Sequence, residues 1–175
     1  IVPAYDLWSA TYDSEKNFLI DLENNTHQVR NRAIRLHTES RESILDIGCG
    51  TGRHALRLSQ YFSQYLGIDS SAGMIQVALK KFAQPNLKFL RTSFLDFHSK
   101  GLFDFLHASL SLMHFSNLQV FFDKAHTLLK QRGILYIVDA NFDLLKSGSS
   151  PNFDRDDGHY VVDHFLHEPE MLRQG

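Results

Sequence analysis

The chain has 175 residues, of which 43% are hydrophobic and 22% charged, with a formal net charge of −2. This length suffices for one domain with a substantial hydrophobic core. The near-neutral charge leaves no basic footprint, so nucleic acid is not an expected partner. Cys49 is the single cysteine, which excludes an internal disulfide framework and favours a reducing compartment such as the cytoplasm. Polar residues interrupt the longest apolar run, which falls short of the roughly 20 residues of a membrane span.

A helix is expected within Asn17–Leu36. Apolar residues at helical spacing are expected roughly on one side of it, namely Phe18, Leu22, Val29, Ala33 and Leu36. The same segment contains three arginines, Arg30, Arg32 and Arg35. Their simplest interpretation is a solvated face.

Between residues 43 and 139, short β-branched or aromatic runs alternate with helical patterns. This alternation is typical of βαβ units around a parallel sheet. Five strands are expected, at Ser43–Gly48, Tyr65–Ile68, Leu87–Arg91, Phe103–Ser109 and Ile134–Asp139. The intervening helices are expected at Ala55–Phe62, from Ser70 or Ser71 to Phe82, and at Asn117–Lys130.

The remainder of the chain is less regular. Phe142–Gly158 is rich in Ser, Gly and Asp and is expected to be a flexible loop. A helix is expected to begin near Glu168, because proline, here Pro169, is tolerated in a first helical turn.

Three glycines, Gly48, Gly50 and Gly52, follow the first strand and precede a helix. Glycines in that position allow positive φ and a close approach of a ligand, and the helix N-terminus suits an anion. A dinucleotide-binding loop would need its third glycine where Arg53 stands, so NAD is the weaker fit. A bare strand-to-helix turn is the other interpretation.

Asp69 ends the second expected strand, at the same sheet edge as the glycines. A carboxylate there can accept hydrogen bonds from both vicinal hydroxyls of a ribose. An ordinary helix-capping aspartate is the alternative.

The run LDIGCGTG at Leu45–Gly52 resembles the first motif of class I S-adenosylmethionine-dependent methyltransferases, and the resemblance extends from about Tyr5 to Gly175. It implies an α/β, Rossmann-like, doubly wound and mostly parallel sheet in the order 3-2-1-4-5, with helices on both faces. It also implies S-adenosylmethionine as cofactor and S-adenosylhomocysteine as product. The C-terminal hairpin of the family is expected to be missing, because Glu168–Gln174 resembles the helix that precedes it.

The resemblance further implies which residues contact the cofactor. Those residues are Tyr12, Asp46, Gly48, Cys49, Gly50, Gly52, Asp69, Ser70, Met74, Asp96, Phe97 and Ser109. Asp46 and the glycine turn would cradle the methionine half, and Asp69 would hold the ribose. Asp96 would accept the exocyclic amine of adenine, and Phe97 would cover its ring.

Tyr5–Asp13 is similar to the YDxWAxxYD opening of small-molecule members, relatives of the biotin-pathway malonyl-carrier methyltransferases. That resemblance implies a segment folded over the cofactor, with Tyr5, Trp8 and Tyr12 as a lid; core packing of the aromatics is the alternative. We therefore expect a single domain, residues 1–175. It would comprise an N-terminal helical lid at 1–38, a cofactor-binding core at 43–139, and a loop with a truncated C-terminal helix at 140–175.

The implied reaction is an in-line methyl transfer to a small-molecule or carrier-linked acceptor. A base is needed only if the acceptor arrives protonated, and His114, after the fourth strand, is the candidate. No metal is expected, because Ser109 stands where an acid would be wanted and Ala140 separates Asp139 from Asn141. A nicotinamide-dependent oxidoreductase and a non-catalytic cofactor-binding module remain the alternatives.

Overall fold

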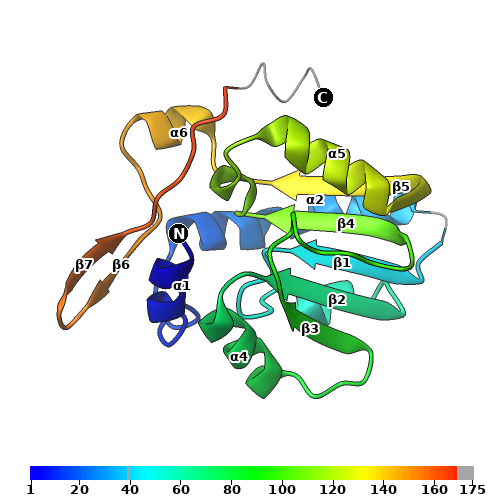
Figure 1. Cartoon of the computed structure of the whole chain (residues 1–175), viewed down its shortest axis with the longest axis horizontal. Helices are drawn as coiled ribbons and strands as arrows, with labels where there is room; N and C mark the ends of the chain where they lie inside the picture. The colour runs from blue at the N-terminus through cyan, green and yellow to red at the C-terminus, as the bar shows by residue number, and fades with distance from the viewer. Residues whose placement is uncertain (39, 169–175) are drawn as a thin grey trace.

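A computed structural model describes residues 1–38 and 40–168, and a five-stranded sheet forms its centre (Figure 1). The strands are β1 (Ser43–Ile47), β2 (Gln64–Asp69), β3 (Leu87–Arg91), β4 (Phe103–Ser109) and β5 (Leu129–Val138). They lie in the order β3-β2-β1-β4-β5, and every neighbouring pair is parallel. The predicted sheet and its strand order are therefore confirmed.

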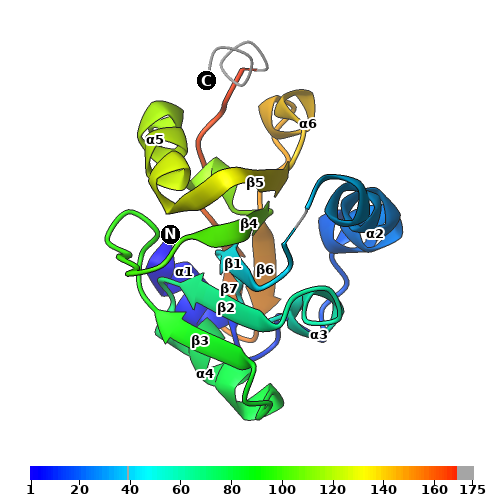
Figure 2. The same cartoon turned by 90° about the vertical axis from the view of Figure 1, so that its right-hand side faces the viewer.

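Helices cover both faces of this sheet. The helices of the described residues are α1 (Val2–Trp8), α2 (Phe18–His37), α3 (Ala55–Leu58), α4 (Ala72–Lys81), α5 (Leu118–Leu128), α6 (Phe142–Lys146) and the 3-10 turn η1 (Leu112–His114). Of these, α1 lies at the edge of the sheet where the strands end rather than on a face (Figure 1). Figure 2 shows α2 and α3 on one face and α5 on the other. Alternate residues of β1 enter the two cores, with Ile44 packing beside Ile34 of α2 and Leu45 in the core that contains Phe121 of α5. The sheet is doubly wound, as the resemblance implied.

Side-chain caps fix where the longer helices begin. Asn17, Ser71 and Asn117 each accept a hydrogen bond from a backbone N–H of the first turn of α2, α4 and α5. The predicted boundaries differ most at two other places. The helix after the glycine turn is shorter than Ala55–Phe62, and β5 begins at Leu129 rather than Ile134.

The apolar residues expected roughly on one side of α2 do not form its buried side. Three of its residues are largely exposed, at 69%, 63% and 62%, namely Phe18, Val29 and Leu36. The side chain of Leu22 lies outside the described part of the structure. The helix buries Glu23, Arg30 and Ile34 instead. The side of α2 that carries Glu23 and Arg30 therefore faces the protein interior, and the side that carries the exposed apolar residues does not.

The segment expected to be a loop, Phe142–Gly158, contains α6 and the first strand of a hairpin. The hairpin pairs β6 (Asn152–Arg155) with β7 (Gly158–Val161) and lies beside α1 (Figure 1). Phe153 is buried because its ring stacks on Trp8, with centroids 4.9 Å apart, and on Tyr160, at 5.1 Å. This aromatic stack orders the segment. The helix expected from Glu168 falls on residues 169–175, outside the described residues.

Among the described residues, no helix combines the length and the apolar character that crossing a membrane requires.

Candidate cofactor and methyl-transfer site

The carboxyl ends of the five strands meet at one edge of the sheet, because the strands are parallel. In Figure 1 the strand arrows point toward α1 and the β6–β7 hairpin. A cavity of about 510 Å³ lies at this edge and is lined by the ends of β1, β2 and β4 together with α1. It lies where the strand order reverses, between β1 and β4, which is the usual ligand position in such sheets.

The glycine turn presents one open face to the cavity. Gly48, Gly50 and Gly52 have φ of 67°, 56° and 77°. A Cβ at Gly50 would have its nearest neighbour, the Sδ of Met74, 4.0 Å away, so a ligand can approach this backbone closely. Gly52 differs, because a Cβ there would lie 2.7 Å from the ring of Phe82. Gly52 does not line the cavity; it allows the turn to pack against α4 and β3.

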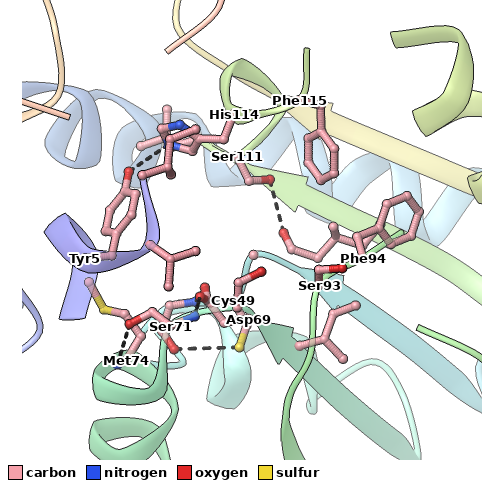
Figure 3. A pocket seen from close by; sticks show the side chains of 18 of the residues that line it. Tyr5, Cys49, Asp69, Ser71, Met74, Ser93, Phe94, Ser111, His114 and Phe115 are labelled. Carbon is pink, nitrogen blue, oxygen red and sulfur yellow. Dashed lines mark hydrogen bonds between the residues drawn. The ribbon is translucent and has the colours of Figure 1, made fainter. Parts of the chain in front are cut away.

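Asp69, at the end of β2, joins this turn to the start of α4 (Figure 3). Its Oδ2 accepts a hydrogen bond from the Gly50 N–H at 2.9 Å, and its Oδ1 accepts one from the Ser71 N–H at 2.8 Å. Burial raises the pKa of the Asp69 carboxyl. The carboxylate lines the cavity with a fixed orientation and with acceptor capacity left for a ligand.

Most of the residues predicted to bind a cofactor line this one cavity. Those are Tyr12, Gly48, Cys49, Gly50, Asp69, Ser70, Met74 and Ser109, together with the candidate base His114. Gly52, Asp46, Asp96 and Phe97 do not line it.

Asp46 lies in β1, two residues before Gly48, and is fully buried. Its Oδ2 accepts a hydrogen bond from the Tyr65 hydroxyl at 2.6 Å, and its Oδ1 one from His107 Nδ1 at 2.8 Å. The expectation that Asp46 cradles a ligand is corrected accordingly: its partners lie within the protein, and its side chain ties β1 to β2 and β4.

The adenine-edge assignment also needs correction. Asp96 is exposed and accepts a hydrogen bond from Ser93 Oγ at 2.6 Å, while Phe97 packs in the core beside Phe103. The cavity wall after β3 is formed by an earlier part of the same loop, Thr92–Leu95. Ser93 and Phe94 therefore occupy the place that the sequence assigned to Asp96 and Phe97.

The N-terminal motif is anchored across the cavity by its two aspartates. Asp6 Oδ1 accepts hydrogen bonds from Ser71 Oγ at 2.6 Å and from the Gly73 N–H at 2.9 Å. Asp13 accepts one from Thr51 Oγ1 at 2.6 Å and pairs with Lys81 at 2.9 Å. Both anchors therefore flank the strand ends that carry the glycine turn and Asp69. They hold the α1 segment over the cavity.

The aromatic residues of the motif divide between the two predicted roles. Tyr5 and Tyr12 line the cavity. Trp8 is buried between Phe153 and Tyr12, so it holds the segment to the hairpin. The second half of the predicted lid, α2, instead packs Ile34 into the core.

Cavity-lining His114 has a defined hydrogen-bond partner on each ring nitrogen. Its Nε2 lies 2.8 Å from the Tyr5 hydroxyl (Figure 3), and its Nδ1 lies 3.2 Å from the backbone oxygen of Asp163. Burial lowers the pKa of His114 to about 4. The imidazole is therefore neutral at pH 7.

The solvated-face interpretation is wrong for Arg30, which is 1% exposed. Its Nη1 lies 3.0 Å from His54 Nδ1, 3.5 Å from His107 Nε2 and 3.6 Å from a carboxylate oxygen of Glu23. Arg53, at the edge of the cavity, also pairs with Glu23. These five residues form a polar cluster beside the cavity, which Arg53 and His54 line, and sequence periodicity gave no signal for it.

The ligand atoms of Glu23, His54 and His107 lie within 4.8 Å of one another, a spacing that a metal ion could bridge. The Arg30 guanidinium lies within 3.6 Å of all three side chains, however. Its positive charge takes the place of a cation among these groups and repels a second one. The cluster is therefore better described as a histidine-lined ion pair than as a metal centre.

The parallel sheet, its strand order and a glycine-turn cavity at the point of order reversal define a Rossmann-like nucleotide-binding protein. Residues 45–137 match the sequence profile of a family described as methyltransferase domain. This match covers more than half of the chain, so the chain belongs to the methyltransferase domain family.

Individual relatives agree with the family. The chain is 28% identical over 109 residues to the probable S-adenosylmethionine-dependent methyltransferase CRG1 of Saccharomyces cerevisiae, covering 59% of this chain and 37% of the relative. It is 34% identical over 105 residues to trans-aconitate 2-methyltransferase of Deinococcus radiodurans, covering 57% and 39%. The chain thus matches well under half the length of these curated relatives.

A solved structure extends the likeness of the fold to nearly the whole chain. The structure of DhpI in complex with SAH superposes with a TM-score of 0.76, covering 99% of this chain and 82% of DhpI. The sequence identity is 18%, so this likeness bears on the fold.

Proposed function

We propose that the protein is an S-adenosylmethionine-dependent methyltransferase acting on a small-molecule or carrier-linked acceptor. The observation that carries this proposal is the Asp69 carboxylate, held beside the open face of Gly50 at the cavity. A ribose acceptor next to an unobstructed backbone turn suits an adenosyl group. The family match and the names of the relatives support the methyl-transfer chemistry.

The adenosyl half fits the side of the cavity between β2 and β3. Asp69 would accept the two ribose hydroxyls. Ser93 and Phe94 would border the adenine, with Ser70 and Met74 on the α4 side. This arrangement replaces the Asp96–Phe97 pair of the sequence-based expectation.

The methionyl half fits the side formed by the glycine turn, Tyr12 and Ser109. Arg53 lines the same part of the cavity and donates a hydrogen bond to Ser109 Oγ at 3.3 Å. A guanidinium held there can bind the carboxylate of the methionyl group. In the sequence, Arg53 is notable only as the residue that disfavours NAD; its position at the cavity supports this second role.

S-adenosylmethionine supplies an activated methyl group on a sulfonium. The protein's task is then to hold the acceptor in line with that group and to exclude water. Tyr5 and Tyr12 close the cavity on the α1 side, and the anchors Asp6 and Asp13 hold them there. His114 borders the same end and is the candidate proton acceptor for the transfer.

Calorimetric titration of the protein with S-adenosylmethionine and S-adenosylhomocysteine tests this proposal. We expect saturable binding of both at a single site. Absence of binding in both titrations would overturn the proposal. Saturable enhancement of NADH fluorescence that neither ligand displaces would instead support the oxidoreductase. Tight cofactor binding without product across a broad acceptor screen would support a non-catalytic module.

Gly52→Ala is expected to destabilise the fold by about 2–4 kcal/mol, because φ is positive there and the added Cβ would meet Phe82. Gly50→Ala has room in the protein, so it should destabilise less and weaken S-adenosylhomocysteine binding instead. Chemical denaturation and calorimetry on the two variants check this contrast. Equal stability losses in both would contradict it.

A further inference from the structure

The Tyr5–His114 hydrogen bond joins the first helix to the turn after β4, inside the cavity (Figure 3). The tautomer of His114 follows from its two partners. The backbone oxygen of Asp163 can only accept, so the Nδ1 next to it carries the hydrogen. The Nε2 is then an acceptor, and the Tyr5 hydroxyl donates to it across 2.8 Å.

This arrangement leaves the Tyr5 oxygen as an acceptor toward the cavity. Its only proton is directed at His114, so its remaining lone pair is available to a group in the cavity. The phenol ring is held in place by stacking on Trp8, with centroids 5.8 Å apart, and by edge contact with His114 at 5.3 Å. The hydroxyl is therefore a fixed acceptor at the end of the cavity that His114 borders.

We propose that the Tyr5 hydroxyl takes the proton of a neutral alcohol or phenol that serves as the methyl acceptor, and passes its own proton to Nε2 of His114. This inference rests on the proposed methyltransferase function and names the acceptor class. Tyr5 is then a catalytic residue, and His114 acts through it.

The transfer balances in atoms and charge. The acceptor oxygen forms a bond to the methyl carbon while the bond from that carbon to sulfur breaks, and sulfur keeps the electron pair. The acceptor proton moves to Tyr5 Oη, and the Tyr5 proton moves to His114 Nε2. The positive charge of the sulfonium therefore ends on the imidazolium, which releases its proton to water.

The low basicity of His114 agrees with a hydroxyl acceptor. Burial lowers its pKa to about 4, yet the protonated ether that a hydroxyl would form is a far stronger acid. An ammonium acceptor, with a pKa of about 10 as in lysine, would require a much stronger base. A carboxylate acceptor carries no proton and needs no relay.

Charged and titratable groups face the pair from several elements. His164 and the amino group of Ile1 act on His114, and both disfavour its protonation. Tyr12, Asp69 and Asp139 act on Tyr5, where burial and these groups raise the phenol pKa. Tyr5 therefore remains neutral over the range in which the rate is measured, and His114 remains neutral until the pH approaches its pKa of about 4.

Methylation of phenol and of benzoate with radiolabelled S-adenosylmethionine tests the proposal. Tyr5→Phe and His114→Phe keep a ring in each position and should each lower the rate with phenol by ~100-fold. The double variant should be no slower than either single one, because the two groups act as a unit. Tyr160→Phe, which removes a phenol of the hairpin outside the cavity, is the matched control. With the native protein, the rate should fall as pH drops toward 4, where His114 becomes protonated.

Binding of S-adenosylhomocysteine separates this proposal from the proposed function. Tyr5→Phe and His114→Phe should bind it with an affinity within about threefold of that of the native protein. Absence of binding to the native protein would overturn the proposed function itself. Methylation of benzoate but not phenol, or an undiminished phenol rate in Tyr5→Phe, would overturn the relay. The ¹⁵N signals of His114 decide if neither probe reacts: an unprotonated Nε2 supports the relay, and a protonated Nε2 overturns it.

Discussion

Asp69→Ala is expected to weaken S-adenosylmethionine binding by about 1.5–3 kcal/mol, or roughly 10- to 150-fold. The variant removes a charged acceptor for two ribose hydroxyls. It also removes the acceptor of the Gly50 and Ser71 N–H groups, which fixes the glycine turn against the start of α4. The loss should therefore exceed that of a contact to the ligand alone.

Asp69→Asn separates these two effects. An amide keeps one acceptor oxygen and the shape of the side chain, so its affinity should fall between those of alanine and the native residue. Asp96→Ala is the matched control, because Asp96 follows the next strand, is exposed and does not line the cavity. Its affinity should be unchanged. Calorimetry measures all three; a change below about threefold in Asp69→Ala would show that the ribose assignment is wrong.

The parts of the site that lie close in sequence could be predicted from the sequence. A buried strand, three glycines and a helix are contiguous, so the turn at Gly48–Gly52 follows from local chemistry. Asp69 could be predicted because parallel strands end at a common edge. Position within a loop is less determined. Phe94 and Phe97 are both aromatic residues after β3, and only the path of the loop places Phe94 at the cavity and Phe97 in the core.

Contacts between distant segments could not be predicted in this way. Asp46 reads as part of the first motif, but the register of β1 and β4 places it beside His107. With that partner it becomes an internal hydrogen-bond acceptor rather than a ligand contact. The Tyr5–His114 contact likewise joins residues 109 positions apart. In both cases the function of a residue depends on which strand or helix the fold brings next to it.

Helix α2 shows the same limit at larger scale. Its apolar residues recur roughly on one side, yet the exposed fractions show another side buried, with Arg30 at its centre. A helix buries charged residues when their partners are also buried, because pairing offsets the cost of desolvation. His54 follows the glycine turn and His107 lies on β4, so no local pattern in α2 reports them.

Arg30→Met should therefore destabilise the protein by about 3–5 kcal/mol. The sequence of α2 alone, in which Arg30 reads as a solvated residue, would predict that this substitution is tolerated. The change keeps a long, flexible side chain but removes the donor to both imidazoles and the positive charge beside Glu23. Arg32→Met, on the exposed side of the same helix, is the matched control and should change the free energy of unfolding by less than about 0.5 kcal/mol.

The ion pair between Arg30 and Glu23 also predicts that substitutions at the two positions are coupled. Glu23→Gln removes the opposing charge, so the double variant should be less destabilised than the sum of the two single ones. Chemical denaturation of the four proteins gives this coupling directly. Additive losses would mean that Arg30 stabilises α2 by packing of its aliphatic part rather than by charge. A native-like Arg30→Met would mean that the buried guanidinium contributes nothing to the fold. Arg53 lines the cavity and shares Glu23 with Arg30. We therefore expect Arg30→Met to weaken S-adenosylhomocysteine binding as well. Unchanged binding would mean that the role of Arg30 is purely structural and remote from the site.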